Sequence, residues 1–122
     1  MIPDIKVVVE DGIVRATYRG EVAYDAVFGT IRNVARTAAE QQTDLLLFDI
    51  REAVFREFHV TIIRHAEEAR SLGIEPTFRI AVLAAMENEK LKYIEDVAVN
   101  RGFQVKVFTE ESEALAWLKS AP

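Results

Sequence analysis

The stretch from Asp44 to Ile50, with the sequence Asp-Leu-Leu-Leu-Phe-Asp-Ile, most constrains the fold of this chain. It is a short apolar run with a carboxylate near each end. A strand that is buried on both faces has this composition, because both sets of side chains meet apolar neighbours. Buried parallel strands are connected and covered by helices. The stretch therefore predicts a central strand in an α/β sheet.

A β-hairpin is predicted before this strand. Residues 5–10 and 13–18 are rich in β-branched side chains, as strands are. Asp11-Gly12 between them is a strong signal for a two-residue turn, because Gly accepts a positive φ. We expect the second strand to end at Gly20.

Helical and strand patterns alternate along the rest of the chain. Apolar residues recur three or four positions apart in four stretches, which predicts helices at residues 23–41, 58–72, 88–100 and 110–118. Asn88 and Thr109 are the predicted caps of the last two helices. Further strands are predicted at residues 78–84 and 103–108, and a loop at 51–57. Gly29 lies inside the first helix, where we expect it to allow close packing.

The predicted order of elements is β-β-α-β-α-β-α-β-α. Right-handed crossovers between the later strands would make them parallel, with helices on both faces of the sheet. We therefore predict an α/β fold with a five-stranded mixed sheet, in which an N-terminal β-hairpin is followed by β-α repeats. Four main helices cover both faces. The whole of residues 1–122 is expected to form a single domain.

Composition excludes several classes of function. The chain has no cysteine, so disulfides, thiolate nucleophiles and Cys-based metal sites are excluded. Its net charge of −5 argues against binding to nucleic acid or to an anionic membrane. We find no long apolar segment and no signal peptide, so we expect a cytoplasmic protein without membrane insertion. No glycine-rich phosphate-binding motif occurs, and no cofactor is predicted.

Three stretches match a known pattern: the hairpin around Asp11-Gly12, the central strand, and the segment from Val107 to Leu118, where an edge strand and a turn lead into an Ala-x-x-Trp-Leu helix. On these stretches the chain resembles the STAS domain group (sulfate transporter and anti-sigma factor antagonist), in particular its SpoIIAA-like, STAS/SEC14-type branch. The resemblance covers nearly the whole chain. It implies regulation through contact with a protein partner.

One feature of the resembled group is missing. Anti-sigma factor antagonists of this group carry a phosphorylatable Ser or Thr at the start of the helix that follows the central strand. The corresponding stretch here, residues 49–59, contains no Ser, Thr or Gly. Thr61 comes later, inside a predicted helix. The phosphorylation switch is therefore not transferred to this chain.

The end of the central strand supplies the candidate site. Open α/β sheets place ligand sites at the carboxyl ends of their strands, and Asp49 is expected there. It is expected either to line a polar pocket or simply to pair with Arg51. Apolar side chains among the following charges would either cover the sheet edge or form an exposed patch for a partner. The candidate interaction or ligand residues are Asp49, Arg51, Val54, Phe55, Phe58 and His59.

Three functions are compatible with these residues. The first is a non-enzymatic interaction module, expected to be a homodimer. The second is a small-molecule or lipid-binding protein, which would need an apolar cavity and would be favoured by one that opens near Phe55, Phe58 and Met86. The third is an enzyme that uses Asp49 and His59 as an acid–base pair. We favour the first and predict no catalytic residue. No metal site is predicted either, since His59 and His65 would lie about 240° apart around a helix.

Overall fold

One mixed β-sheet forms the centre of the molecule. The computed structural model describes residues 4–55, 68 and 70–120. The strands lie in the order β1-β2-β3-β4-β5, with bounds β1 (Asp4–Glu10), β2 (Ile13–Val22), β3 (Leu45–Phe55), β4 (Arg79–Leu83) and β5 (Gln104–Phe108). β1 pairs antiparallel with β2, and all other neighbours are parallel. The predicted five-stranded mixed sheet, with the apolar stretch at its centre, is confirmed.

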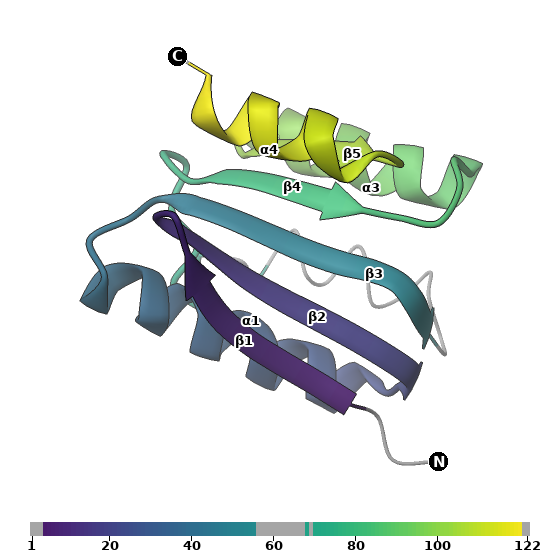
Figure 1. Cartoon of the computed structure of the whole chain (residues 1–122), viewed down its shortest axis with the longest axis horizontal. Helices are drawn as coiled ribbons and strands as arrows, with labels where there is room; N and C mark the ends of the chain where they lie inside the picture. Colours follow the sequence, from purple (N-terminus) through teal and green to yellow (C-terminus); the bar gives the residue numbers. More distant parts are fainter. Residues whose placement is uncertain (1–3, 56–67, 69, 121–122) are drawn as a thin grey trace.

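Three helices are described: α1 (Tyr24–Glu40), α3 (Glu89–Asn100) and α4 (Glu111–Lys119). α1 and α3 lie on one face of the sheet and α4 on the other (Figure 1). Helices on both faces are thus confirmed, and three of the four predicted helices lie within the described residues. The helix predicted at residues 58–72 lies almost wholly outside the described residues. None of the described helices is long and apolar enough to cross a membrane.

The larger core lies between the sheet and α1. Alternate residues of β2, namely Val14, Ala16 and Tyr18, point to this face and are buried. They meet Val34 and Ala38, which lie four positions apart on α1 and so share one side of that helix. The period of two in the strand and the period near four in the helix therefore produce one continuous apolar layer.

The smaller core lies under α4. Leu47, Leu83 and Leu118 are almost fully buried there. The Trp117 ring lies 5.7 Å from the Phe108 ring, and the Arg79 guanidinium stacks 4.6 Å above the indole. This cation–π contact holds the last helix against β4. Trp117 is partly buried and packs against this smaller core.

The predicted loop at residues 51–57 is wrong for residues 51–55, which continue β3. The pairing with β2 passes from Thr17–Asp49 to Arg19–Glu52, so β3 carries one extra residue at this point. This is a β-bulge. It shifts the alternation, and Ile50, Ala53 and Phe55 all pack on the α1 face as a result. The alternation of inward and outward side chains is therefore interrupted at the bulge, although β3 itself continues through it.

The backbone differs from prediction at the end of β2 and at the cap of α4, and agrees with it at the cap of α3. Gly20 does not end β2, which continues to Val22; Gly20 has a φ of +81° within the strand. The Asn88 side chain accepts a hydrogen bond from the Leu91 amide and caps α3 as predicted. Thr109 is not the cap of α4, because Glu110 holds that position without a side-chain bond. Gly29 is exposed, and no described atom lies near enough to require glycine there.

Candidate functional site

Asp49 lies in the middle of β3, not at its carboxyl end as predicted, because β3 continues to Phe55. The residue is 4% exposed. Its Oδ1 accepts hydrogen bonds from the backbone N–H and the Nε of Arg51, at 3.2 and 3.0 Å. Its Oδ2 accepts from the Nη2 atoms of Arg51 and Arg15, each at 2.8 Å. Both carboxylate oxygens are therefore occupied by guanidinium groups.

Glu111 completes this group of charges. Its Oε1 accepts hydrogen bonds from Arg15 Nη2 at 2.7 Å and from Arg51 Nη2 at 3.2 Å. We call Arg15, Asp49, Arg51 and Glu111 the ionic cluster. Two arginines and two carboxylates give it no net charge, and it joins β2, β3 and the first turn of α4.

The environment keeps Asp49 ionised. Burial opposes its ionisation, but hydrogen bonds from Arg51 and Arg15 outweigh this and lower the pKa of Asp49 to about 2. The hydrogen bond from Arg15 likewise lowers the pKa of Glu111. A carboxylate with so low a pKa is a poor proton acceptor near neutral pH. Of the two roles foreseen for Asp49, pairing with Arg51 is the one that the geometry supports.

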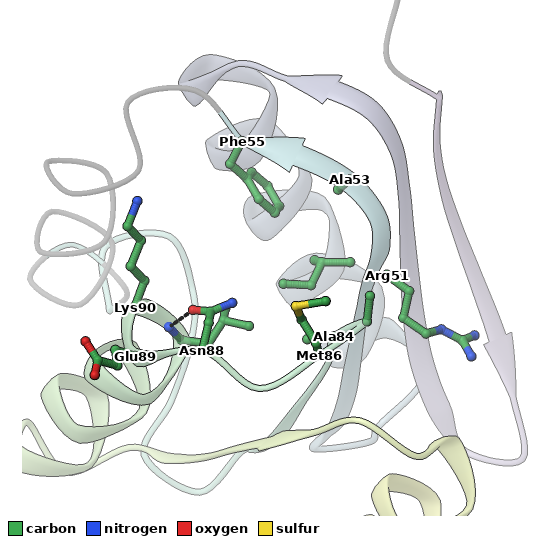
Figure 2. A pocket seen from close by; sticks show the side chains of 11 residues that line it. Arg51, Ala53, Phe55, Ala84, Met86, Asn88, Glu89 and Lys90 are labelled. Atoms are coloured by element: carbon green, nitrogen blue, oxygen red, sulfur yellow. Dashed lines mark hydrogen bonds between the residues drawn. The ribbon is translucent and has the colours of Figure 1, made fainter.

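An open depression lies at the carboxyl ends of β3 and β4 (Figure 2). Its volume is about 550 Å³. We call it the apolar depression, because its apolar lining comes from Ile50, Ala53, Phe55, Ala84, Met86 and Leu91. Asn88, Glu89 and Lys90, at the start of α3, form its polar side. The Phe55 ring faces the depression, whereas the Arg51 guanidinium points away from it toward the ionic cluster.

A second depression of about 510 Å³ adjoins the first, between the start of α3 and β5. Its lining is rich in charge, with Glu87, Lys92, Glu95 and Lys106. We call it the charged depression. Both depressions include Asn88 and Glu89, so they form one continuous surface across the ends of three strands. Within the described part of the chain, no three acidic or histidine side chains gather closely enough to hold a metal ion.

Comparison with solved structures identifies the architecture. An uncharacterised protein of the DUF3478 family with a SpoIIAA-like fold, from Shewanella loihica, superposes with a TM-score of 0.62 at 17% identity, over 95% of this chain and 93% of the other. The anti-sigma factor antagonist SpoIIAA in its unphosphorylated form superposes with a TM-score of 0.58 at 15% identity, over 97% of this chain and 100% of the other. The chain has a SpoIIAA-like fold. No protein-family model and no curated protein matches it.

The SpoIIAA-like fold separates the predicted site residues into two groups. Asp49 and Arg51 belong to the ionic cluster, on the α4 side of the sheet. Phe55 lies on the opposite side, where it is half-buried with its ring 6.0 Å from that of Tyr18. Val54 is 60% exposed. The remaining two predicted residues, Phe58 and His59, lie outside the described residues.

Arg15 was not predicted as a site residue, and Met86 was named only as a neighbour of the cavity that a ligand-binding protein would need. Met86 is 69% exposed and lies in the apolar depression. Its sequence position gave a usable signal, because loops that follow parallel strands carry the ligand sites of α/β sheets. Arg15 gave none, since an arginine in a half-buried strand is normally expected to face water.

Proposed function

We propose that this SpoIIAA-like chain is a non-enzymatic, STAS-type interaction module that binds a protein partner. The contact surface is the continuous surface of the apolar and charged depressions. An apolar side chain of the partner would enter beside Met86 and Phe55. Polar groups of the partner would lie against Lys92 and Lys106. An apolar centre with a charged margin is the usual composition of a protein interface.

One observation carries this proposal: the two depressions are open and adjoin each other along the ends of β3, β4 and β5. A small ligand is normally enclosed over most of its surface. An open surface suits a loop or an extended segment of another protein better. The exposed Met86 strengthens this interpretation, because a flexible thioether side chain adapts to the shape of a partner.

Two further observations support a role without catalysis. The acid–base role considered for Asp49 requires a carboxylate that can take up a proton, but both its oxygens are bonded to arginines. SpoIIAA, which shares this fold, is by its name an antagonist of an anti-sigma factor and thus acts on a protein. Residues 49–59 contain no Ser or Thr, so we propose that phosphorylation in this stretch does not control the contact.

A second candidate function is the binding of a small apolar molecule or lipid. The volume of the apolar depression, about 550 Å³, falls within the range of ligand pockets. Native mass spectrometry of the purified chain separates the two functions. A bound small molecule would appear as a defined added mass that is lost on denaturation.

The variant Met86→Glu tests the proposed contact. It places a charge in the apolar depression at a side chain that is mostly exposed, so the fold should be retained. A protein captured by the wild-type chain from cell extract, and then purified, should bind at least about tenfold more weakly to the variant, as for loss of a buried interface anchor. Isothermal titration calorimetry measures this change.

Val99→Glu is the matched control. Val99 is 52% exposed on α3 and lines neither depression, so the control should bind like the wild type. Equal affinity of Met86→Glu and wild type would contradict the proposed surface. Equal weakening by both variants would also contradict it, because the effect would then arise from charge alone.

A further inference from the structure

The two edge strands of the sheet, β1 and β5, differ in whether side chains bond to their outer backbone groups. At the β5 edge, the backbone N–H of Val107 donates to the Glu95 carboxylate of α3 at 2.9 Å. The Gln104 side chain donates to the carbonyl of Pro76 at 3.2 Å. A side chain that occupies a backbone donor on an edge strand prevents pairing with a further strand. The β5 edge is thus partly closed by the chain itself.

The β1 edge has no such protection within residues 4–55 and 70–120. There β1 pairs with β2 alone, and five of its seven residues are exposed. Val8 and Val9 are 43% and 40% exposed. The hairpin turns tightly at Asp11-Gly12, so Glu10 and Ile13 form its last pair. Because hydrogen-bonded pairs alternate along an antiparallel ladder, residues 5, 7 and 9 direct their backbone groups toward the free edge.

We propose that the β1 edge binds the β1 edge of a second copy of this chain. The two strands run antiparallel about a two-fold axis at Val8, which joins the two sheets into one of ten strands. In this register Val7 of each copy exchanges hydrogen bonds with Val9 of the other. This contact is separate from the proposed partner surface, because β1 lines neither depression.

Charge selects this register. With Val8 on the axis, Lys6 lies opposite Glu10 of the second copy, and the pair occurs twice by symmetry. Neither side chain has an ion-pair partner among the residues that the structure describes, and both are exposed. Placing Val7 on the axis would instead set Asp4 opposite Glu10, and like charges directly opposite destabilise a strand pair.

A charge exchange tests both the edge and the register. Lys6→Glu and Glu10→Lys should each weaken self-association roughly tenfold, because each sets like charges opposite each other twice in the dimer. The double variant Lys6→Glu/Glu10→Lys should restore association to within about threefold of wild type, since the pairs reform with exchanged signs. Sedimentation velocity over a range of concentrations measures the dissociation constant.

Three outcomes would overturn the proposal. A wild-type chain that stays monomeric at millimolar concentration has no such contact. Single variants that associate like the wild type would place any dimer contact elsewhere. A double variant that fails to recover association, while its circular dichroism melt matches that of the wild type, would exclude this register.

Disulfide trapping provides an independent measurement, because the chain has no cysteine of its own. Facing residues in a non-hydrogen-bonded pair have Cα atoms about 4.5 Å apart, which suits a disulfide. With oxidised glutathione as the oxidant, Val8→Cys should cross-link to a dimer at least about tenfold faster than the exposed control Val54→Cys. Equal cross-linking rates would overturn the proposal. Met86→Glu should leave the Val8→Cys rate unchanged, which separates this contact from the proposed partner surface.

Discussion

Among single residues, Asp49 lies at the centre of the ionic cluster, on the α4 side of the sheet. It is a buried carboxylate on a central strand, and it draws Arg15 and Arg51 together where they would otherwise repel each other. Glu111 pairs with the same two guanidinium groups. Such a cluster is stable when every charge has a partner, and it becomes costly when one partner is removed.

The variant Asp49→Asn should lower the free energy of unfolding by about 2 kcal/mol. The amide fits the site, but it leaves Arg15 and Arg51 with a single shared carboxylate. Urea denaturation at neutral pH measures the loss. Glu52→Gln is the control, since Glu52 and Arg19 form an exposed pair worth about 0–1 kcal/mol. Similar losses of unfolding free energy in the two variants would show that the buried Asp49 stabilises the fold no more than an exposed ion pair does.

At the level of elements, β3 shows what sequence periodicity can and cannot predict. The apolar stretch 44–50 identified the central strand, because burial on both faces leaves a composition that is easily recognised. The last five residues of β3 were mistaken for a loop. A bulge beside Ile50 shifts the alternation there, and a test for a period of two fails on either side of an inserted residue. The Asn88 cap could be predicted, because its hydrogen bond is local.

The helix α1 offers a stability test that depends on one position. Gly29 is exposed, and a Cβ there would meet no described atom within 4 Å. Gly29→Ala should therefore raise the free energy of unfolding by up to about 1 kcal/mol, because Ala favours the helix more than Gly does. Thermal unfolding followed by circular dichroism should show a higher midpoint.

Gly73→Ala should have the opposite effect and serves as the control. Gly73 has a φ of +101°, and a Cβ there would lie 3.0 Å from the Cβ of Ala35 on α1. Strain and crowding together should cost at least about 1 kcal/mol. A lower midpoint for Gly29→Ala, or an unchanged one for Gly73→Ala, would contradict the packing described for α1.

For the molecule as a whole, the five-stranded mixed sheet and the helices on both its faces could be predicted, but the ionic cluster could not. Strand and helix patterns are local, and crossover rules then determine which strands are parallel. The cluster depends on Arg15 and Glu111, which are 96 positions apart in the chain. No spacing rule connects such residues. Phe55 and Met86 could be placed together beside a possible cavity, but the exposure of Met86 could not be predicted, since it depends on how α3 packs against β4.

Stability of the whole molecule should fall in acid because of the same cluster. The pKa of Asp49 is about 2 in the folded chain, against an ordinary value of 3.8. A lowered pKa stabilises the fold above the ordinary value, and this contribution disappears as pH falls through the folded value. A pKa difference of nearly two corresponds to about 2 kcal/mol. The advantage of wild type over Asp49→Asn should thus be complete at pH 6 and shrink between about pH 4 and pH 2.

Denaturant titrations at several pH values measure this difference. Because Glu111 and Glu95 also have lowered pKa values, both proteins should lose stability in acid. Only the gap between the two proteins reports on Asp49. A gap that stays constant down to pH 2 would contradict the assignment of the stabilisation to its ionised form.

The strands of this sheet follow one another in space in the same order as in the chain. A ribosome that makes the protein from its amino terminus therefore releases each new strand beside a neighbour that already exists. No strand has to enter between two that are already paired. The hairpin, whose pairing is the most local, provides the first template, and later strands extend the sheet in one direction only. Growth ends at β5, where Glu95 occupies the amide of Val107.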